Sequence, residues 1–170
     1  DMDRLGLITE RFSNIGSEPS LTVYKLYEVL EESVRYINSR TSQKVEISIK
    51  NIEIFQTINV AVNKPLFAWV VENLCKNAVD AMDGEGAIWF EVSGTGDEMI
   101  QFDAVDTGKG IPANRHTTIF KPGYTTKKRG WGLGLSLVKR IIENYHSGKI
   151  YVQSSEVGKG TRFRIELRKA

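Results

Sequence analysis

The residues with the clearest chemical capacity lie in one segment, from Glu72 to Met82. Asn73, Asn77 and Asp80 recur there at helical spacing, and at about 100° per residue they fall within roughly 60° of one another. Amide and carboxylate oxygens suit Mg²⁺, which keeps most of its water and takes one or two protein ligands beside phosphate oxygens. The spacing therefore predicts a helix face that could hold Mg²⁺, although a polar face in solvent would show the same pattern.

A second group of such residues follows an apolar strand that is predicted from Met99 to Val105. It reads Asp106-Thr107-Gly108-Lys109-Gly110-Ile111. A carboxylate at a strand end can accept a hydrogen bond from the exocyclic amine of adenine, and nearby glycines let a base approach the backbone without a Cβ clash. The group predicts a site for a nucleotide base, and the alternative is an ordinary Asp-x-Gly turn, which is common.

A glycine-rich, basic stretch then leads into another predicted helix. Six of the 15 glycines lie between Gly108 and Gly134, and the segment from Thr107 to Ile142 holds eight Lys or Arg residues and no acid. Glycines at a helix N-terminus leave backbone N–H groups free for phosphate. The stretch therefore predicts a phosphate-binding lid. It matches neither a Walker nor a dinucleotide pattern, because Gly-Lys-Ser/Thr and a surrounding βαβ unit are missing.

The elements that must position these residues follow from hydrophobic periodicity. Helices are predicted at 24–40, at 64–82 with Asn63 as its cap and Pro65 in its first turn, and at 132–145. Strands are predicted at 45–49, 52–58, 88–93, 99–105, 149–154 and 161–167. Hairpin-linked strands and helices in this order predict an α+β fold, a two-layer α/β sandwich in which helices pack on one face of a mixed sheet.

Length and composition fit one domain with a short appendage. Residues 1–16 are predicted to be the tail of a helix that begins upstream, and residues 17–170 the domain itself. No apolar run approaches the roughly 20 residues that cross a bilayer. We therefore expect a soluble domain without direct membrane contact, in a parent protein that could still be membrane-anchored. The single cysteine, Cys75, is predicted to be a buried, inert thiol.

Taken together, these stretches resemble the GHKL superfamily of gyrase, heat-shock chaperone, histidine kinase and MutL ATPases, which share the Bergerat fold. The similarity is greatest to the catalytic, ATP-binding domain of two-component sensor histidine kinases. Four boxes carry it in the family's order: an N box at 73–78, a first glycine box at 106–110, an F box at 120–123 and a second glycine box at 130–135. The closing segment 158–163 is also similar, and the resemblance covers about residues 22–168.

The resemblance implies a site for ATP and Mg²⁺. Asn77 would coordinate Mg²⁺, Asp106 would bind the adenine amine, and Thr161 would assist near the adenine. Either Lys127 or Lys128 would lie near the γ-phosphate. The expected nucleotide-binding residues are Asn73, Asn77, Asp80, Asp106, Gly108, Gly110, Ile111, Phe120, Thr125, Thr126, Lys128, Gly130, Gly132, Leu133, Gly134, Leu135 and Thr161.

The expected reaction is transfer of the γ-phosphoryl group of ATP to a histidine. In the branches that hydrolyse ATP, the position four residues before the Mg²⁺ ligand is a glutamate that activates water, whereas this chain has Asn73, which is no base. Phosphoryl transfer needs little beyond positioning, Mg²⁺ and positive charge. Glu72, Asn73 and Lys127 are the expected catalytic residues, where Glu72 would polarise the incoming imidazole or be a simple surface carboxylate.

The resemblance implies that the acceptor histidine lies outside this chain, and that residues 1–16 are the tail of the upstream dimerisation helix that would carry it. It also implies a cytoplasmic domain, in a parent protein that could be anchored in the inner membrane. Neither His116 nor His146 is followed by the acidic residue of the family's acceptor box. His116 is interpreted as a surface residue near the lid, and His146 as a helix C-terminal residue favoured by the helix dipole. The expected partners are a histidine-bearing dimerisation domain of the same protein and a response regulator, and no nucleic acid. The alternatives are a GHKL-type ATPase and a nucleotide-sensing module that binds partners without transfer.

Overall fold

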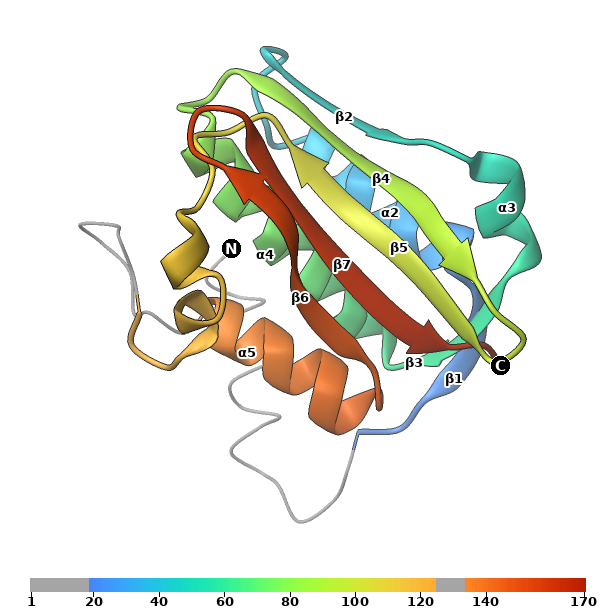
Figure 1. Ribbon diagram of the computed structural model, residues 1–170. Helices are drawn as coiled ribbons and strands as arrows, with labels where there is room; N and C mark the ends of the chain where they lie inside the picture. The colour runs from blue at the N-terminus through green and yellow to red at the C-terminus, as the bar shows by residue number, and fades with distance from the viewer. Residues whose placement is uncertain (1–18, 125–133) are drawn as a thin grey trace.

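The fold is built on one mixed β-sheet. The computed structural model describes residues 19–124 and 134–170. Its five-stranded sheet has the order β2-β4-β5-β7-β6 (Figure 1), formed by β2 (Val45–Ile49), β4 (Gly86–Thr95), β5 (Met99–Asp106), β7 (Gly160–Arg168) and β6 (Lys149–Glu156). β2 pairs with β4 in parallel, and the other neighbours are antiparallel. The sheet is therefore mixed, as predicted.

Helices cover one face of this sheet. They are α2 (Leu26–Asn38), α4 (Lys64–Ala81) and α5 (Gly134–Arg140), which continues into a π-helical turn (Ile141–Tyr145). In Figure 1, α2 and α4 lie behind the strands, and α5 packs beside α4. Alternate strand residues point toward the helices, and Phe90 of β4 and Ile165 of β7 are fully buried there. The predicted two-layer α/β sandwich is confirmed.

A second, two-stranded sheet departs from the prediction. It joins β1 (Thr22–Lys25) to β3 (Asn59–Val62), so the first helix begins at Leu26 and not at 24. The strand predicted at 52–58 is wrong, because α3 (Ile52–Thr57) is helical. The chain turns into α3 at Asn51, which has a left-handed backbone with φ of 56°, and within α3 only Phe55 is buried. An apolar run too short to show a clear period had favoured a strand.

The helix that carries the N box begins as expected. Asn63 is the N-cap of α4: its side-chain oxygen accepts the N–H of Leu66 at 3.2 Å, and Pro65 lies in the first turn. The side-chain amide of Asn63 also donates to the carbonyl oxygen of Ser20, which ties the helix start to the segment before β1. Cys75 in α4 is fully buried, and burial raises the pKa of its thiol to about 12. The predicted buried thiol is confirmed.

The sheet face away from the helices carries a charged cluster that joins β4, β5 and β7. Asp103 is fully buried at its centre. Arg162 lies 2.7 Å from Asp103 and 2.6 Å from Glu91, and Arg164 lies 2.9 Å from Asp103. Although burial opposes its ionisation, hydrogen bonds from both arginines hold the pKa of Asp103 below its usual value. The cluster therefore fixes the pairing of the two strands whose ends form the site described below.

Two short 3₁₀ helices, η1 (Ala113–Arg115) and η2 (Thr118–Phe120), follow β5. They connect the sheet to the segment that precedes α5. Within residues 19–124 and 134–170, no helix combines the length and the apolar character that a membrane span requires.

Candidate functional site

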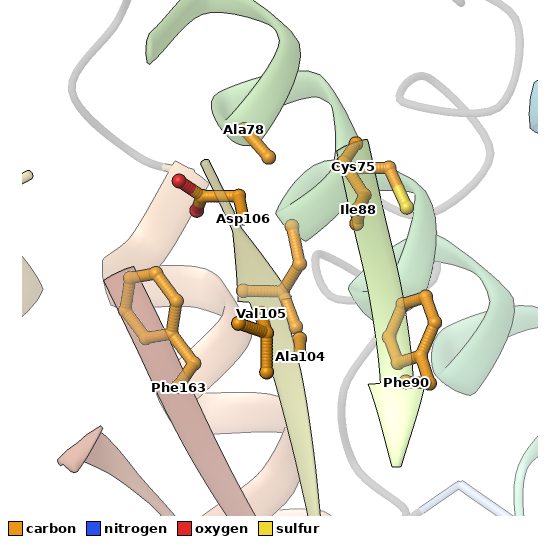
Figure 2. Close-up of a pocket in the computed structure, with 9 residues that line it drawn as sticks. Cys75, Ala78, Ile88, Phe90, Ala104, Val105, Asp106 and Phe163 are labelled. Carbon is orange, nitrogen blue, oxygen red and sulfur yellow. The ribbon is translucent and has the colours of Figure 1, made fainter. Parts of the chain in front are cut away.

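An apolar pocket lies between α4 and the sheet. It is lined by Leu74, Cys75 and Ala78 of α4, Ile88 and Phe90 of β4, Ala104, Val105 and Asp106 of β5, and Phe163 of β7 (Figure 2). Asp106 is the one charged residue in this lining. In Figure 2 its carboxylate lies at the same end of the pocket as Ala78. The chemical character of this lining, apolar walls with one carboxylate at an end, matches that of a flat apolar ligand with a polar edge.

Asp106 is the last residue of β5, and its side chain is almost entirely buried. Burial raises the pKa of its carboxyl group, while hydrogen bonds from the backbone N–H groups of Gly108 and Thr161 act in the opposite direction. The bond from Gly108 measures 2.8 Å. A carboxylate has about four acceptor positions, so two protein donors leave it able to accept from a ligand. The arrangement fits the predicted binding of an amine.

The glycines that follow Asp106 are required by the protein itself. A Cβ on Gly108 would lie 2.7 Å from the Cβ of Ala81, and the next N–H, that of Lys109, bonds the carbonyl oxygen of Ala81 at 2.8 Å. Gly110 has φ of +78°, and a Cβ there would meet the carbonyl oxygen of Glu156. The loop is thus held against the end of α4 and against the β6–β7 turn. These glycines were predicted to let a base approach the backbone, and the structure shows that they allow these contacts within the protein.

Three polar side chains form a row across the ends of β5, β7 and β6. Asp106 pairs directly with Thr161, and Thr161 pairs directly with Ser155. The hydroxyl oxygens of Thr161 and Ser155 lie 2.8 Å apart. Ser155 also accepts the backbone N–H of Ile111 at 2.7 Å and donates to the carbonyl oxygen of Gly160 at 3.0 Å. Residues opposed in an antiparallel pair share a face, so the row lies on the pocket side of the sheet.

Ser155 was not among the predicted site residues. The signal for it was the hairpin itself, because the Gly158-Lys159-Gly160 turn sets which residue of β6 faces Thr161. Ile111, which was predicted to contact the nucleotide, packs against the core, and its backbone N–H donates a hydrogen bond to the Ser155 hydroxyl. The row of polar side chains at this end of the sheet therefore includes one residue, Ser155, that was not predicted.

The polar residues of α4 differ in their surroundings. Asn73 is half-buried, Asn77 is half-buried and Asp80 is exposed. Glu72 is 4% exposed, so its interpretation as a simple surface carboxylate is wrong. None of these four residues lines the apolar pocket in the described structure. They lie on the same helix as Ala78, which places them beside the apolar pocket and not within its lining.

The side-chain nitrogen of Asn73 has no hydrogen-bond partner in the described part of the chain. Among the described residues its Nδ2 atom is one of two buried side-chain nitrogens without a hydrogen bond. A Cβ added to Gly134, the first residue of α5, would lie only 3.0 Å from this nitrogen. The structure thus brings the N box and the second glycine box together. An unpaired buried donor is costly unless something else satisfies it, which points to a polar ligand at this contact.

Two other predicted residues belong to the hydrophobic core or pack against it. Phe120 is buried and packs edge-on against Phe163, with ring centroids 6.1 Å apart. Phe163, and not Phe120, lines the pocket. Leu135 is partly buried against the core. The predicted residues Thr125, Thr126, Lys127, Lys128, Gly130, Gly132 and Leu133 lie outside the described residues.

The two histidines have structural contacts. His116 Nε2 lies 2.9 Å from the carbonyl oxygen of Ile111. His146 is buried: its Nε2 accepts the backbone N–H of Asn63 at 3.1 Å, and its Nδ1 lies 2.8 Å from the carbonyl oxygen of Ile141. Because an N–H can only donate, Nε2 carries no proton, Nδ1 carries one, and the ring is neutral. The interpretation of His146 as a partial positive charge on the helix dipole is therefore wrong, and burial lowers its pKa.

Comparison with known proteins gives a consistent picture. Residues 62–170 match the family model described as histidine kinase-, DNA gyrase B- and HSP90-like ATPase. The sensor histidine kinase ZraS of Salmonella typhi is 31% identical over 169 residues, which are 98% of this chain and 36% of ZraS. The chain therefore spans little more than a third of that relative.

Solved structures show the same fold. The catalytic domain of histidine kinase ThkA, in a nucleotide-free form, superposes with a TM-score of 0.74 at 27% identity, over 88% of this chain and 95% of that domain. Histidine kinase ThkA in complex with the response regulator protein TrrA superposes with a TM-score of 0.75 at 24% identity, over 99% of this chain and 48% of the ThkA chain. The second likeness is one of fold alone.

Proposed function

We propose that this chain, which belongs to the histidine kinase-, DNA gyrase B- and HSP90-like ATPase family, transfers the γ-phosphoryl group of ATP to a histidine. Within that family it is an ATP-binding catalytic domain of the sensor histidine kinase type. The acceptor would lie on a dimerisation domain of the same parent protein. The observation that carries the proposal is the buried Asp106 carboxylate, at the end of an apolar pocket beside the N-box helix α4. It supports a base site adjacent to a phosphate site.

The base side of the proposal rests on complementarity. The purine would lie between the α4 side chains Leu74 and Ala78 and the ring of Phe163, and its exocyclic amine would donate to Asp106. A buried carboxylate that has no cationic partner in its described contacts favours a neutral donor such as an amine N–H. A 6-oxo group would instead place an oxygen against the carboxylate. Adenine is therefore the favoured base.

The phosphate side rests on α4 and the start of α5. The unpaired Nδ2 of Asn73 and its contact with Gly134 fit a phosphate oxygen as the missing acceptor. Asn77, one helical turn further along, offers an amide oxygen of the kind that Mg²⁺ accepts. Bound Mg²⁺ would neutralise charge on the phosphate oxygens. Lys127 or Lys128 stays the predicted partner of the γ-phosphate.

Transfer is favoured over hydrolysis because the position four residues before the proposed Mg²⁺ ligand is Asn73, which is not a base. The amide of Asn73 cannot take a proton from water, whereas a neutral imidazole nitrogen already has the lone pair that attacks phosphorus. A bond then forms from this nitrogen to the γ-phosphorus, the bond from the γ-phosphorus to the bridging oxygen breaks, and ADP leaves with that electron pair. The extra imidazole proton passes to solvent. The chain's own contribution is to position ATP for this step.

The proposed partners follow from the family. ThkA has been solved with a response regulator protein, and we propose that a response regulator receives the phosphoryl group from the acceptor histidine here too. We propose a cytoplasmic location for this domain, as its likeness to sensor histidine kinase catalytic domains suggests.

A trans-phosphorylation assay tests the proposal. The chain is mixed with the separately produced dimerisation domain of its parent, Mg²⁺ and γ-labelled ATP, and we expect acid-labile, base-stable label on a histidine. At an ATP concentration near the wild-type Kd, D106N should strongly reduce labelling, whereas D97N, which changes an exposed aspartate in the β4–β5 turn, should not. Steady phosphate release without labelled histidine would indicate the hydrolysing alternative. ATP binding with neither product would indicate a nucleotide-sensing module, and either result contradicts the proposal.

A further inference from the structure

Ser155 lies at a junction that no nucleotide-binding role yet explains. It is partly buried on β6, opposite Thr161, which is in turn opposite Asp106. Its hydroxyl oxygen is within hydrogen-bond distance of three protein atoms: the backbone nitrogen of Ile111 at 2.7 Å, the Thr161 hydroxyl at 2.8 Å and the carbonyl oxygen of Gly160 at 3.0 Å. A hydroxyl has one donor and two acceptor positions, so this group is saturated.

The directions of these bonds follow from counting hydrogens. The backbone N–H of Ile111 donates to Ser155, and the carbonyl oxygen of Gly160 can only accept. Both oxygen–oxygen contacts are hydrogen bonds only when the Ser155 hydrogen points at Gly160 and the Thr161 hydrogen points at Ser155. The donor of Thr161 is thereby used within the protein. What its hydroxyl has left to offer toward the pocket is lone pairs.

The direction of the hydrogen bond from Thr161 to Ser155 determines which groups of a ligand Asp106 and Thr161 can recognise together. Asp106 offers acceptors because it is a carboxylate, and Thr161 offers acceptors because it donates its hydroxyl hydrogen to Ser155. The side chain of Thr161 shares a sheet face with Asp106 and with the pocket-lining Phe163, two residues along β7. An exocyclic amine has two N–H donors, and it matches two acceptors. A group that carries no hydrogen matches neither.

We propose that Ser155 is a specificity-determining positioning residue, which holds the Thr161 hydroxyl as an acceptor so that Asp106 and Thr161 together recognise the 6-amino group of the purine. The inference rests on the proposed placement of adenine at Asp106. Ser155 touches no ligand in this scheme and acts through Thr161. Its bond to the N–H of Ile111 also fixes the loop that follows Asp106, so both sides of the amine site depend on one hydroxyl.

A purely structural role for Ser155 makes a different prediction. If it merely held the loop at Ile111, its loss would weaken the binding of every purine triphosphate by the same factor. The proposal requires instead that the loss depends on the 6-amino group. Purine riboside triphosphate, which is ATP with hydrogen in place of that amine, separates the two because its ring nitrogens and triphosphate are otherwise those of ATP.

The experiment measures the Kd of ATP and of purine riboside triphosphate, with Mg²⁺, for the wild-type chain and three variants. S155A should weaken ATP about threefold to tenfold, the value of one neutral hydrogen bond, and leave the analogue unchanged. S155T restores a hydroxyl and should restore ATP binding. S154A, which removes an exposed hydroxyl from the neighbouring position on β6, should bind both nucleotides like the wild type.

Equal losses for the two nucleotides in S155A, or no loss for either, would overturn the inference. If S155A does not fold, T161V decides: it should weaken ATP but not the analogue, and equal losses there refute the scheme. The proposed function fails in a different way, because it requires wild-type binding of ATP and loss of binding in D106N. Suppose that both of those conditions are met, but that S155A and T161V lose the same affinity for ATP as for the analogue. The adenine site then stands, and only the proposed role of Ser155 is refuted.

Discussion

Replacing Asp106 by asparagine tests the adenine site with the smallest change in shape. The carboxylate already accepts backbone N–H groups from Gly108 and Thr161, and an asparagine has one oxygen where the aspartate has two. Its NH₂ group must therefore face either a backbone donor or the adenine amine. Loss of one hydrogen bond to a charged group costs about 1.5–3 kcal/mol, and each 1.4 kcal/mol is about tenfold in affinity. We expect the Kd for ATP to rise about a hundredfold in D106N.

The fold should survive this change. Burial raises the pKa of the Asp106 carboxyl, which means that the folded state disfavours the charged form, and a neutral amide removes that cost. Isothermal titration calorimetry measures the affinity, and circular dichroism checks that the melting temperature is not lowered. A Kd for ATP within threefold of the wild-type value, in a folded D106N protein, would refute the adenine assignment.

The same raised pKa predicts a pH dependence of binding. The carboxyl protonates at a higher pH than an ordinary aspartate, so ATP affinity should be full above the folded pKa and decline as the pH falls through it. In D106N the weak residual affinity should lack this component. Calorimetry across acidic pH, with D97N as the control, would show whether the decline belongs to Asp106.

Two further predictions concern stability. Because burial lowers the pKa of His146, its neutral form contributes stability that is present above the unfolded-state pKa, about 6.5, and is lost as the pH falls below it. The melting temperature of H146Q should therefore fall less on acidification than that of the wild type. Parallel melting profiles of the two proteins would contradict the buried neutral ring. In urea unfolding, the free energy of unfolding of G110A should be lower than that of G158A by about 1–3 kcal/mol. Both glycines have positive φ, but only at Gly110 would a Cβ meet the backbone of Glu156. Equal losses would show that the loop does not approach the β6–β7 turn so closely.

Much of the fold could be read from the sequence because its elements are long and strongly periodic. The helix at 64–82 is a clear case, since Asn63 and Pro65 mark its start and apolar residues recur along it; it was placed within one residue of α4. The strands of the closing hairpin were also predicted within two residues. The strand predicted over the short apolar run at 52–58 was wrong, because a segment as short as the six residues of α3 can bury Phe55 from a helix as well as from a strand.

The site was predictable in its parts and not in its connections. The order of the four boxes pointed to ATP, and the family match supports that reading. Spacing could not show that Glu72 is buried, that Phe120 packs edge-on against Phe163, or that His146 is neutral between Asn63 and Ile141. Each of these depends on neighbours that are distant in the chain.

The sequence by itself determined the family, the order of the elements and the residue types available for nucleotide chemistry, because periodicity, caps and glycines act over a few residues. Only the tertiary structure decided which of those residues meet. Asp106, Thr161 and Ser155 form one row through the register of three strands, and Asn73 meets Gly134 through the packing of two helices. The direction of a hydrogen bond depends on all the donors and acceptors around it, and that information exists only once the chain has folded.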